Sequence, residues 1–324
     1  MNILVMGGNG FVGQHLVKRL SEIQGSKINV LCRKRHEIYL VDIETLSNVR
    51  VVYDCDITDF TAIENHFAYI DIVFNLAGFI SFSQRDKEQL IAVNHHGALN
   101  VLKASEKHNV KKMIHLSSTA AYGFSDDVID ENTQFDWSGY KKCVYSYSKS
   151  LPDDELIQSK MNVIVVNPPT IFGPGDAKLL DIFNVVKKGL PFVPSGRNSV
   201  VDVRDLVAAL VMVMEKELPN QKLIVTGGNY SIMELNSAIS KVLAVRPPRF
   251  NIPKFFSPLL GWLILLADSL IKNLGVGYDQ MIFGFKDRIH SDARMRALGY
   301  IPEYALEESI NDTLEFLKQK KLYE

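Results

Sequence analysis

The chain of 324 residues has little of several features that mark specialised protein classes. Its three cysteines, Cys32, Cys55 and Cys143, are too few and too widely spaced for a disulfide framework or a Cys/His zinc site. We therefore predict no metal site and a reducing, cytoplasmic location. The formal net charge is −1, so the basic surplus of nucleic-acid-binding domains is missing and we expect no nucleic-acid partner.

Signal-length and membrane-length apolar runs are also missing. The segment 1–8 lacks a basic region followed by an apolar stretch, so it predicts a first strand and not a signal peptide. The segment 255–267 has thirteen uncharged residues, whereas a membrane span needs about 17 or more. We expect it to form a buried or interfacial helix, in contact with the core, the substrate or a membrane surface, without stable membrane insertion.

The composition of the chain, and its alternation of apolar runs with helical windows, are typical of a folded α/β protein. Hydrophobic residues make up 47% and charged residues 23%, which excludes disorder as the main state. Short apolar runs alternate with helical windows, as in a parallel sheet whose strands are buried on both faces. The expected strands are 3–6, 28–32, 49–53, 72–76, 113–117, 163–167 and 200–203; the expected helices are 11–23, 60–66, 87–108, 144–160, 177–188, 205–216, 233–245 and 306–318.

These elements predict a Rossmann-type doubly wound sheet with a smaller, mostly helical C-terminal substrate region. We assign residues 1–167 and about 199–218 to an NAD(P)-binding domain. Residues 168–198 and about 219–324 form the predicted substrate-binding region.

A glycine-rich turn follows the first strand and opens the first helix. Gly7, Gly10 and Gly13 have the spacing G-x-x-G-x-x-G, which allows a tight turn and a close approach of the backbone to a pyrophosphate. The free N–H groups of the helix N-terminus favour the same anion. The predicted phosphate-binding residues are Gly7, Asn9, Gly10, Phe11, Val12 and Gly13.

The end of the second strand bears on which dinucleotide binds. An NAD site has Asp or Glu about 20 residues beyond the motif, for the ribose 2′-hydroxyl. Arg33 stands at that position, within a basic run that continues to His36, and Glu37 is the first carboxylate after it. A guanidinium suits a 2′-phosphate, so NADP(H) is favoured, with NAD(H) and a merely solvated basic loop as the alternatives.

A tyrosine, a lysine and a serine form a candidate catalytic set. Tyr145 and Lys149 are four residues apart, so they share one face of a helix, and the lysine charge is expected to favour the phenolate. Ser118 directly follows the expected strand 113–117, where a hydroxyl can hydrogen-bond a substrate carbonyl or cap a helix. Tyr147 is a possible substrate contact, but no lysine lies four residues after it.

Six motifs together resemble the extended short-chain dehydrogenase/reductase superfamily, the NAD(P)-dependent epimerase/dehydratase group, over residues 1 to about 215. They are the glycine turn, Asp56-Ile57, Asn75-Leu76-Ala77-Gly78, Asn94-His95-His96-Gly97, Ser117 to Gly123 and Tyr145-x-x-x-Lys149. The sequence departs from the family pattern at Ala98, where a threonine is usual.

The resemblance implies a role for each matching position. Tyr145 would be the acid–base residue, Ser118 its hydroxyl partner, and Lys149 would hold the nicotinamide ribose and lower the tyrosine pKa. The implied cofactor contacts are Asp56 and Ile57 at the adenine; Leu76, Ala77 and Gly78 at the ribose side; Asn94; and Pro168 and Pro169 beside the nicotinamide.

The residues expected near the substrate indicate the branch of the family. Nucleotide-sugar enzymes of the family usually have an Arg-Asp pair where this chain has Asn198-Ser199. The segments 81–86, 167–176 and 252–266 are similar to dihydroflavonol-reductase-like and 3β-hydroxysteroid-dehydrogenase-like proteins. We therefore expect an NADP(H)-dependent oxidoreductase for a carbonyl or alcohol of apolar character.

Two alternatives stay open, namely a nucleotide-sugar epimerase or dehydratase with tightly bound NAD and a non-catalytic dinucleotide sensor. By analogy with the superfamily we also expect a homodimer through the helices 87–108 and 144–160.

Overall fold

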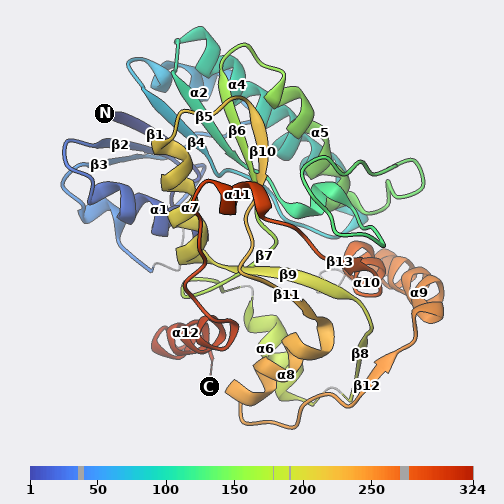
Figure 1. Cartoon of the computed structure of the whole chain (residues 1–324). Coiled ribbons are helices and arrows are strands. Elements are labelled where there is room, and N and C mark those ends of the chain that lie inside the picture. The colour runs from blue at the N-terminus through green and yellow to red at the C-terminus, as the bar shows by residue number, and fades with distance from the viewer. Residues whose placement is uncertain (36–39, 178, 190, 271–276, 324) are drawn as a thin grey trace.

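A parallel seven-stranded sheet forms the larger layer of the molecule. The computed structural model describes residues 1–35, 40–177, 179–189, 191–270 and 277–323. The strand order is β10-β6-β5-β4-β1-β2-β3, and it reverses between β1 and β4 (Figure 1). Ligands of such sheets bind outside the carboxyl ends of the strands at this reversal. The bounds are β1 Asn2–Met6, β2 Lys27–Leu31, β3 Val49–Val52, β4 Ile72–Asn75, β5 Lys112–Leu116, β6 Asn162–Asn167 and β10 Gln221–Ile224.

Helices cover both faces of this sheet, which confirms the predicted Rossmann-type fold. Successive side chains of a strand point to opposite faces, so each buried strand contributes to two cores. Helices α1 (Phe11–Ser21) and α7 (Val203–Glu215) cover one face, and α2 (Phe60–Glu64), α4 (Ala98–Lys107) and α5 (Val144–Ile157) cover the other.

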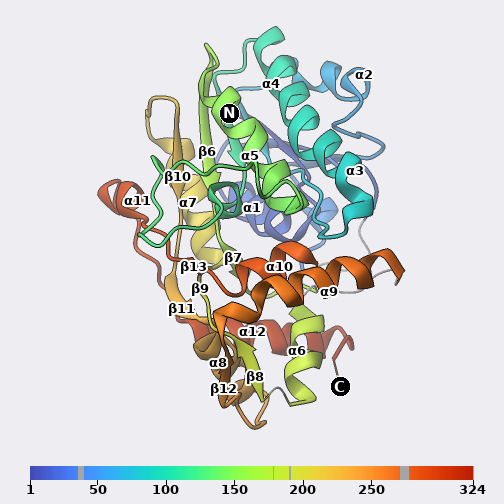
Figure 2. The ribbon, with the colours of Figure 1, turned by 90° about the vertical axis from the view of Figure 1, so that its right-hand side faces the viewer.

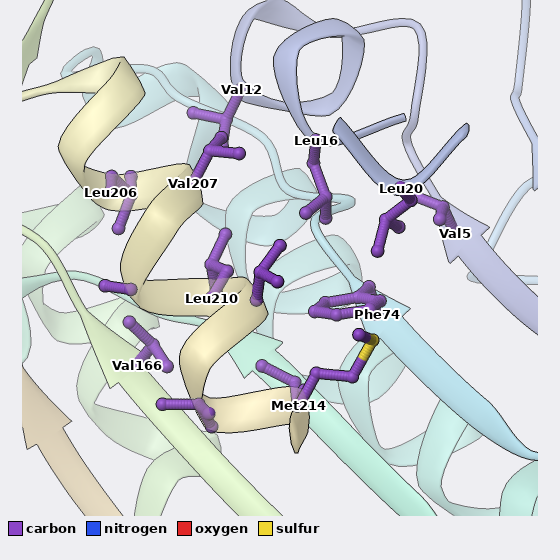
Figure 3. Packing of buried hydrophobic residues seen from close by; sticks show 14 of the residues in the cluster. Val5, Val12, Leu16, Leu20, Phe74, Val166, Leu206, Val207, Leu210 and Met214 are labelled. Carbon is purple, nitrogen blue, oxygen red and sulfur yellow. The ribbon is translucent and has the colours of Figure 1, made fainter. Parts of the chain in front are cut away.

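The packing on the first face is dense (Figure 3). Leu16 and Leu20 of α1 and Met214 of α7 join Val5 and Phe74 of the strands in one cluster, and Leu16, Leu20, Val5 and Phe74 are fully buried. Each such side chain contributes about 1.5–3 kcal/mol when fully buried. This core holds the first helix, and with it the glycine turn, against the sheet.

The helix expected at 87–108 is divided into three pieces. Helix α3 (Lys87–Ile91) is followed by a π-helical turn, Ala92–Gly97, and then by α4. Such wide turns are rare and occur often at functional sites. Here the turn contains Asn94, whose side chain is bonded to the loop after β4.

A second layer lies below the main sheet in Figure 1. Strand β9 (Arg197–Asp202) pairs with β7 (Thr170–Phe172), β11 (Gly228–Ser231) and β13 (Asp287–Arg288), and β8 (Phe192–Pro194) pairs with β12 (Phe250–Ile252). An apolar core between α6, α8 and α12 supports this layer. The helices that complete it are α6 Leu179–Lys187, α8 Ile232–Val242, α9 Ser257–Leu270, α10 Tyr278–Phe283, α11 Ala293–Ala297 and α12 Leu306–Gln319.

Two strands differ from the sequence expectation. The strand expected at 200–203 was assigned to the dinucleotide domain, but β9 pairs only within the second layer. Strand β10, from the expected substrate region, is instead the edge strand of the seven-stranded sheet beside β6. Its four residues begin with the polar Gln221 and Lys222, so the sequence has no apolar run from which this strand could be predicted. The division into two domains stays a prediction.

The apolar segment 255–267 is not a core helix. It forms most of α9, whose buried residues are Ser257, Gly261 and Asp268, while most of its leucines are exposed. Of the two expected forms, the buried helix is therefore wrong, and the interfacial helix stays a prediction. Within the described ranges, no helix combines the length and the apolar character needed to cross a bilayer.

Candidate active site

The predicted site residues gather at the carboxyl ends of the main strands, although they come from seven segments of the chain. The glycine turn follows β1, Arg33 follows β2, Asp56 and Ile57 follow β3, and Gly78 follows β4. Ser118 follows β5, Pro168 and Pro169 follow β6, and helix α5 contributes Tyr145 and Lys149. This is the edge at which open α/β sheets bind their ligands.

The glycine turn is packed so closely that side chains are excluded. Gly7 has φ +74°, and a Cβ on it would lie 3.0 Å from the Cα of Ala77. A Cβ on Gly13 would lie 2.4 Å from the carbonyl oxygen of Gly7. Glycine is therefore required at both positions, and the backbone of this turn stays accessible to a ligand.

The N-terminus of α1 is open toward this ligand position. Its N-cap residue is Gly10, which has no side chain to accept from the first N–H groups of the helix. The Asn9 amide donates to the Lys34 carbonyl (2.7 Å), and the Gln14 amide donates to the Asn9 carbonyl (2.9 Å). These two bonds fix the turn and bring the loop after β2 next to it.

That loop places Arg33 beside the glycine turn. Arg33 is the second residue after β2, precedes Lys34 and is exposed. Arg35 pairs with Glu44 at 2.9 Å at the surface. His36 and Glu37, which the sequence argument also used, lie outside the described residues.

Ser118 and Tyr145 lie close together at the carboxyl end of β5. Ser118 is the N-cap of a short 3₁₀ helix, Thr119–Tyr122, and its hydroxyl accepts from the Ala120 N–H at 3.1 Å. The same hydroxyl lowers the pKa of the Tyr145 phenol, so the two side chains lie close together. The expected capping role of this serine is confirmed, and its hydrogen bond to a substrate carbonyl stays a prediction.

Lys149 was expected to lower the pKa of Tyr145, but the pKa of this phenol is raised in the structure. Burial raises the pKa of Tyr145 to about 12, against the hydrogen bond from Ser118, and Lys149 is not among the groups that shift it. Burial also lowers the pKa of Lys149 to about 8. The Lys149 ammonium lies 3.4 Å from the Leu116 carbonyl oxygen, deep under the site. Removal from water therefore dominates both groups.

Asn94 holds the wall of the site between β4 and α5. Its amide accepts from the Phe79 N–H at 2.8 Å and donates to the Phe79 carbonyl and the Ser148 hydroxyl, both at 2.9 Å. A Cβ on Gly78 would come within 3.3 Å of the Lys149 nitrogen. Asn94 is therefore a supporting residue in this structure, and a direct cofactor contact by it stays a prediction.

The remaining predicted contacts border the same edge. The Asp56 carboxylate accepts from the N–H (2.9 Å) and hydroxyl (2.8 Å) of Thr58, while Ile57 is buried against Gly97. Pro168 is buried, and its carbonyl accepts from the Thr119 N–H at 2.9 Å, which ties the end of β6 to the turn that holds Ser118.

The sequence matches a known protein family over most of its length. The family model for the NAD dependent epimerase/dehydratase family matches residues 3–227. The chain belongs to this family. Its members are NAD-dependent oxidoreductases and epimerases of the extended short-chain type, so the resemblance drawn from the six motifs is confirmed.

Curated relatives include both reductases and epimerases. The chain is 27% identical over 354 residues to an anthocyanidin reductase of Vitis vinifera (98% of this chain, 95% of the relative). It is 25% identical over 281 residues to sterol demethylase protein B of Methylococcus capsulatus (83% and 82%). It is also 25% identical over 336 residues to the N-acetyl-alpha-D-glucosaminyl-diphospho-ditrans,octacis-undecaprenol 4-epimerase of Escherichia coli O157:H7 (99% and 97%).

Solved structures share the fold over the whole chain. The crystal structure of gox2253 superposes with a TM-score of 0.82, at 22% identity and 99% coverage of both chains. The UDP-glucose 4-epimerase of Thermotoga maritima superposes with a TM-score of 0.75, at 23% identity, covering 99% of this chain and 100% of that one. At these identities the likeness shows the fold alone.

The glycine turn fits the dinucleotide that this family uses. Gly7 and Gly13 leave a cradle that a single Cβ would fill, and the open N-terminus of α1 faces it. Gly10 to Gly13 are therefore suited to bind the diphosphate, and Lys149 lies close enough to the end of β4 to reach a ribose.

Sequence reasoning missed Asp153, which lies beneath the catalytic set. Its carboxylate accepts from the Ser117 hydroxyl at 3.0 Å and from the Asn167 amide at 2.8 Å. Burial raises its pKa to about 6. Asp153 follows Lys149 by four residues on the same helix, so the i, i+4 rule already used for Tyr145 could have found it.

The substrate side contains three more residues that the sequence did not indicate as site residues. The Phe82 ring meets the Tyr145 ring edge-on, with centroids 5.4 Å apart. The Asp279 carboxylate accepts from the Ser146 N–H at 3.0 Å, and Arg288 donates from Nε to the Gly123 carbonyl at 3.1 Å. Asp279 raises the tyrosine pKa and Arg288 lowers it, so both lie within electrostatic range of the phenol.

Proposed function

We propose that the chain is an NADP(H)-dependent oxidoreductase that interconverts a carbonyl and an alcohol on a substrate of apolar character. The observation that carries this proposal is that the Ser118 hydroxyl, just after β5, lies close enough to the Tyr145 phenol to lower its pKa, with Lys149 buried four residues along the same helix. A bound nicotinamide would supply or accept a hydride at the carbonyl carbon.

The protein side chains handle the proton of the substrate oxygen. Because the pKa of Tyr145 is raised to about 12, the phenol holds its proton at neutral pH and is ready to donate it to a forming alkoxide. The Ser118 hydroxyl orients the substrate oxygen toward this phenol. Lys149, whose pKa burial lowers to about 8, is predominantly a cation at neutral pH, and beside Gly78 it lies where it can hold the ribose of a bound nicotinamide.

The preference for NADP(H) follows from the position of Arg33. The bond from Asn9 to Lys34 fixes the basic loop next to the glycine turn, where the 2′-substituent of an adenosine ribose is bound in this fold. An exposed guanidinium there offers charge-assisted bonds to a phosphate. We expect Arg33→Ser to weaken NADPH binding about tenfold and to leave NADH binding unchanged.

The substrate class is argued from the position that nucleotide-sugar enzymes use to hold a diphosphate. Asn198 is bonded to the Thr170 hydroxyl at 3.1 Å, and the buried Ser199 is bonded to the His290 ring at 2.8 Å. Neither side chain carries a charge for a diphosphate. An anthocyanidin reductase and sterol demethylase protein B among the relatives support a largely apolar substrate.

The first experiment is to identify the nucleotide released when the freshly purified protein is denatured, with NADPH and NADH titrations on the same preparation. Little retained nucleotide and tighter NADPH binding would support an exchanging reductase. Near-stoichiometric NAD would instead favour the epimerase alternative, in which the cofactor cycles in place. A carbonyl substrate screen follows the first result.

Tyr145→Phe tests the catalytic assignment. We expect turnover to fall at least about a hundredfold, because proton transfer is lost, while NADPH binding stays nearly intact. Tyr147→Phe is the matched control, since it lies on the same helix without a lysine four residues on. Turnover by Tyr145→Phe close to that of the control would refute the assignment.

A further inference from the structure

Helix α9 has its apolar side facing outward. The residues that it buries are Ser257, Gly261 and Asp268, which are small or polar. The outward face is a continuous stripe at helical spacing, and we call it the α9 stripe. It consists of Leu259, Trp262, Leu263, Leu266 and Leu270, preceded by Phe255.

The exposure of the α9 stripe is large for side chains of this kind. Trp262 is 59% exposed, Leu270 76% and Phe255 74%. Surface helices of globular proteins normally turn such residues to the core and their polar residues to water. A contiguous exposed apolar patch indicates an interaction surface.

Contacts along α9 prevent the stripe from rotating inward. A Cβ on Gly261 would lie 2.9 Å from the end of Ile282, so α10 packs directly on this point of the helix. The Asp268 carboxylate accepts from the Ser83 hydroxyl (3.2 Å) and the Gln84 N–H (3.0 Å). The inner face is therefore fixed at two points, and the stripe faces away from the body of the protein.

The exposed charged residues of the segment that contains the stripe are basic. Between residues 246 and 270 the basic residues Arg246, Arg249 and Lys254 are exposed, and the one acidic residue, Asp268, is buried. The Lys254 ammonium forms an ion pair with the Asp287 carboxylate, with 3.1 Å between nitrogen and oxygen. The exposed surface of this segment thus combines leucine and aromatic side chains with cations.

A pair of exposed aromatic side chains lies beside the basic residues of this segment. The rings of Phe192 and Phe250 stack with centroids 5.4 Å apart where β8 and β12 pair, next to Arg249 in the chain. Figure 2 looks onto this side of the molecule, with α9 and α10 in front and β8 and β12 below them.

We propose that the α9 stripe docks flat on an anionic lipid bilayer. Leucine with tryptophan and phenylalanine suits the boundary between headgroups and acyl chains, and flanking lysine and arginine are attracted to anionic lipid. The fourteen residues of α9 lie in the interface and do not cross it. Charge complementarity favours this occupant over an uncharged apolar partner surface.

Docking there places the membrane next to the active site. Helix α10 packs on α9 and, through Asp279, holds the N-terminal turn of α5, one residue from Tyr145. An apolar substrate could then enter from the lipid without crossing water. This last step rests on the proposed function, whereas bilayer docking does not.

The test is co-sedimentation of the full chain with vesicles, one set of phosphatidylcholine alone and one containing phosphatidylglycerol. The stripe variant is Leu263→Asp with Leu266→Asp. The matched control, Val128→Asp with Ile301→Asp, places the same charges on exposed apolar residues elsewhere (58% and 73%). We expect wild type and control to bind anionic vesicles, and the stripe variant to bind at least about tenfold more weakly.

Two readouts separate docking from misfolding and from self-association. Circular dichroism and urea unfolding of all three proteins report that they are folded. With Trp137→Phe, Trp262 is the single tryptophan, and its emission should shift to shorter wavelength when anionic vesicles are added.

Several results would overturn the proposal. Wild type that stays unbound, or a stripe variant that binds like the control, would do so. A wild-type dimer that the stripe variant converts to a monomer, without vesicle binding by either, would assign the stripe to a second copy of the chain.

Discussion

Replacing Gly13 by alanine tests whether the glycine turn is held as closely as the structure indicates. Gly13 is the third residue of α1, and a Cβ there would lie 2.4 Å from the Gly7 carbonyl oxygen and 2.6 Å from the Gly8 Cα. Both are backbone atoms, so no side-chain rotation can relieve the overlap. The turn itself must shift.

The magnitude follows from two opposing terms. Alanine gains about 1 kcal/mol over glycine in a helix interior. Overpacking in a closely packed region costs about 1–3 kcal/mol or somewhat more, and a contact with backbone on two sides is at the upper end. We therefore expect Gly13→Ala to lower the free energy of unfolding by about 2 kcal/mol. Because the displaced backbone is the predicted diphosphate site, NADPH affinity should fall by about tenfold or more.

Urea unfolding followed by circular dichroism gives the stability change, and a fluorescence titration gives the NADPH affinity. Gly139→Ala is the control, since a Cβ there has no neighbour within 4 Å and should change stability by less than about 0.5 kcal/mol. If Gly13→Ala matched the control in both measurements, the close packing of the turn and its role in binding would be refuted.

Two further predictions concern buried polar groups. The pKa of Asp153 is raised by burial from 3.8 to about 6, so the stability that its protonated form contributes is complete below pH 3.8 and is lost as the pH rises through about 6. Wild type should therefore lose roughly 2–3 kcal/mol relative to Asp153→Asn over that window, in urea unfolding at several pH values; a difference independent of pH would contradict the shift. Asn94→Ala removes three hydrogen bonds and leaves the Phe79 backbone without its partner, so it should cost about 2–4 kcal/mol in the same assay, and a cost below about 1 kcal/mol would contradict this supporting role.

Features that depend on local spacing could be predicted from the sequence. The glycine turn is determined by three residues within one strand-to-helix junction, and Tyr145 and Lys149 are brought together by one helical turn. Ser118 could be placed at a strand end because the apolar run stops there. In each case the residues involved are close together in the chain, so their spacing is enough to predict their relative positions.

Electrostatic consequences could not be predicted in the same way. The lysine was expected to lower the pKa of Tyr145, but the pKa is raised to about 12. The direction depends on how much water reaches the phenol and the ammonium, and that is set by the packing of Phe82 and of the C-terminal helices around them. Spacing on one helix contains no information on this burial.

The substrate side of the site was hidden for a related reason. Asp279 contacts Ser146 across 133 residues of sequence, and Arg288 contacts Gly123 across 165. Neither residue belongs to a periodic pattern that would mark it, because each acts through one tertiary contact. The same holds for α9, where the sequence contains the apolar residues but the direction of the stripe is decided by Gly261 and Asp268 on the opposite face. A helix rich in leucine faces outward here because Gly261 and Asp268, on its opposite face, make the contacts to the body of the protein.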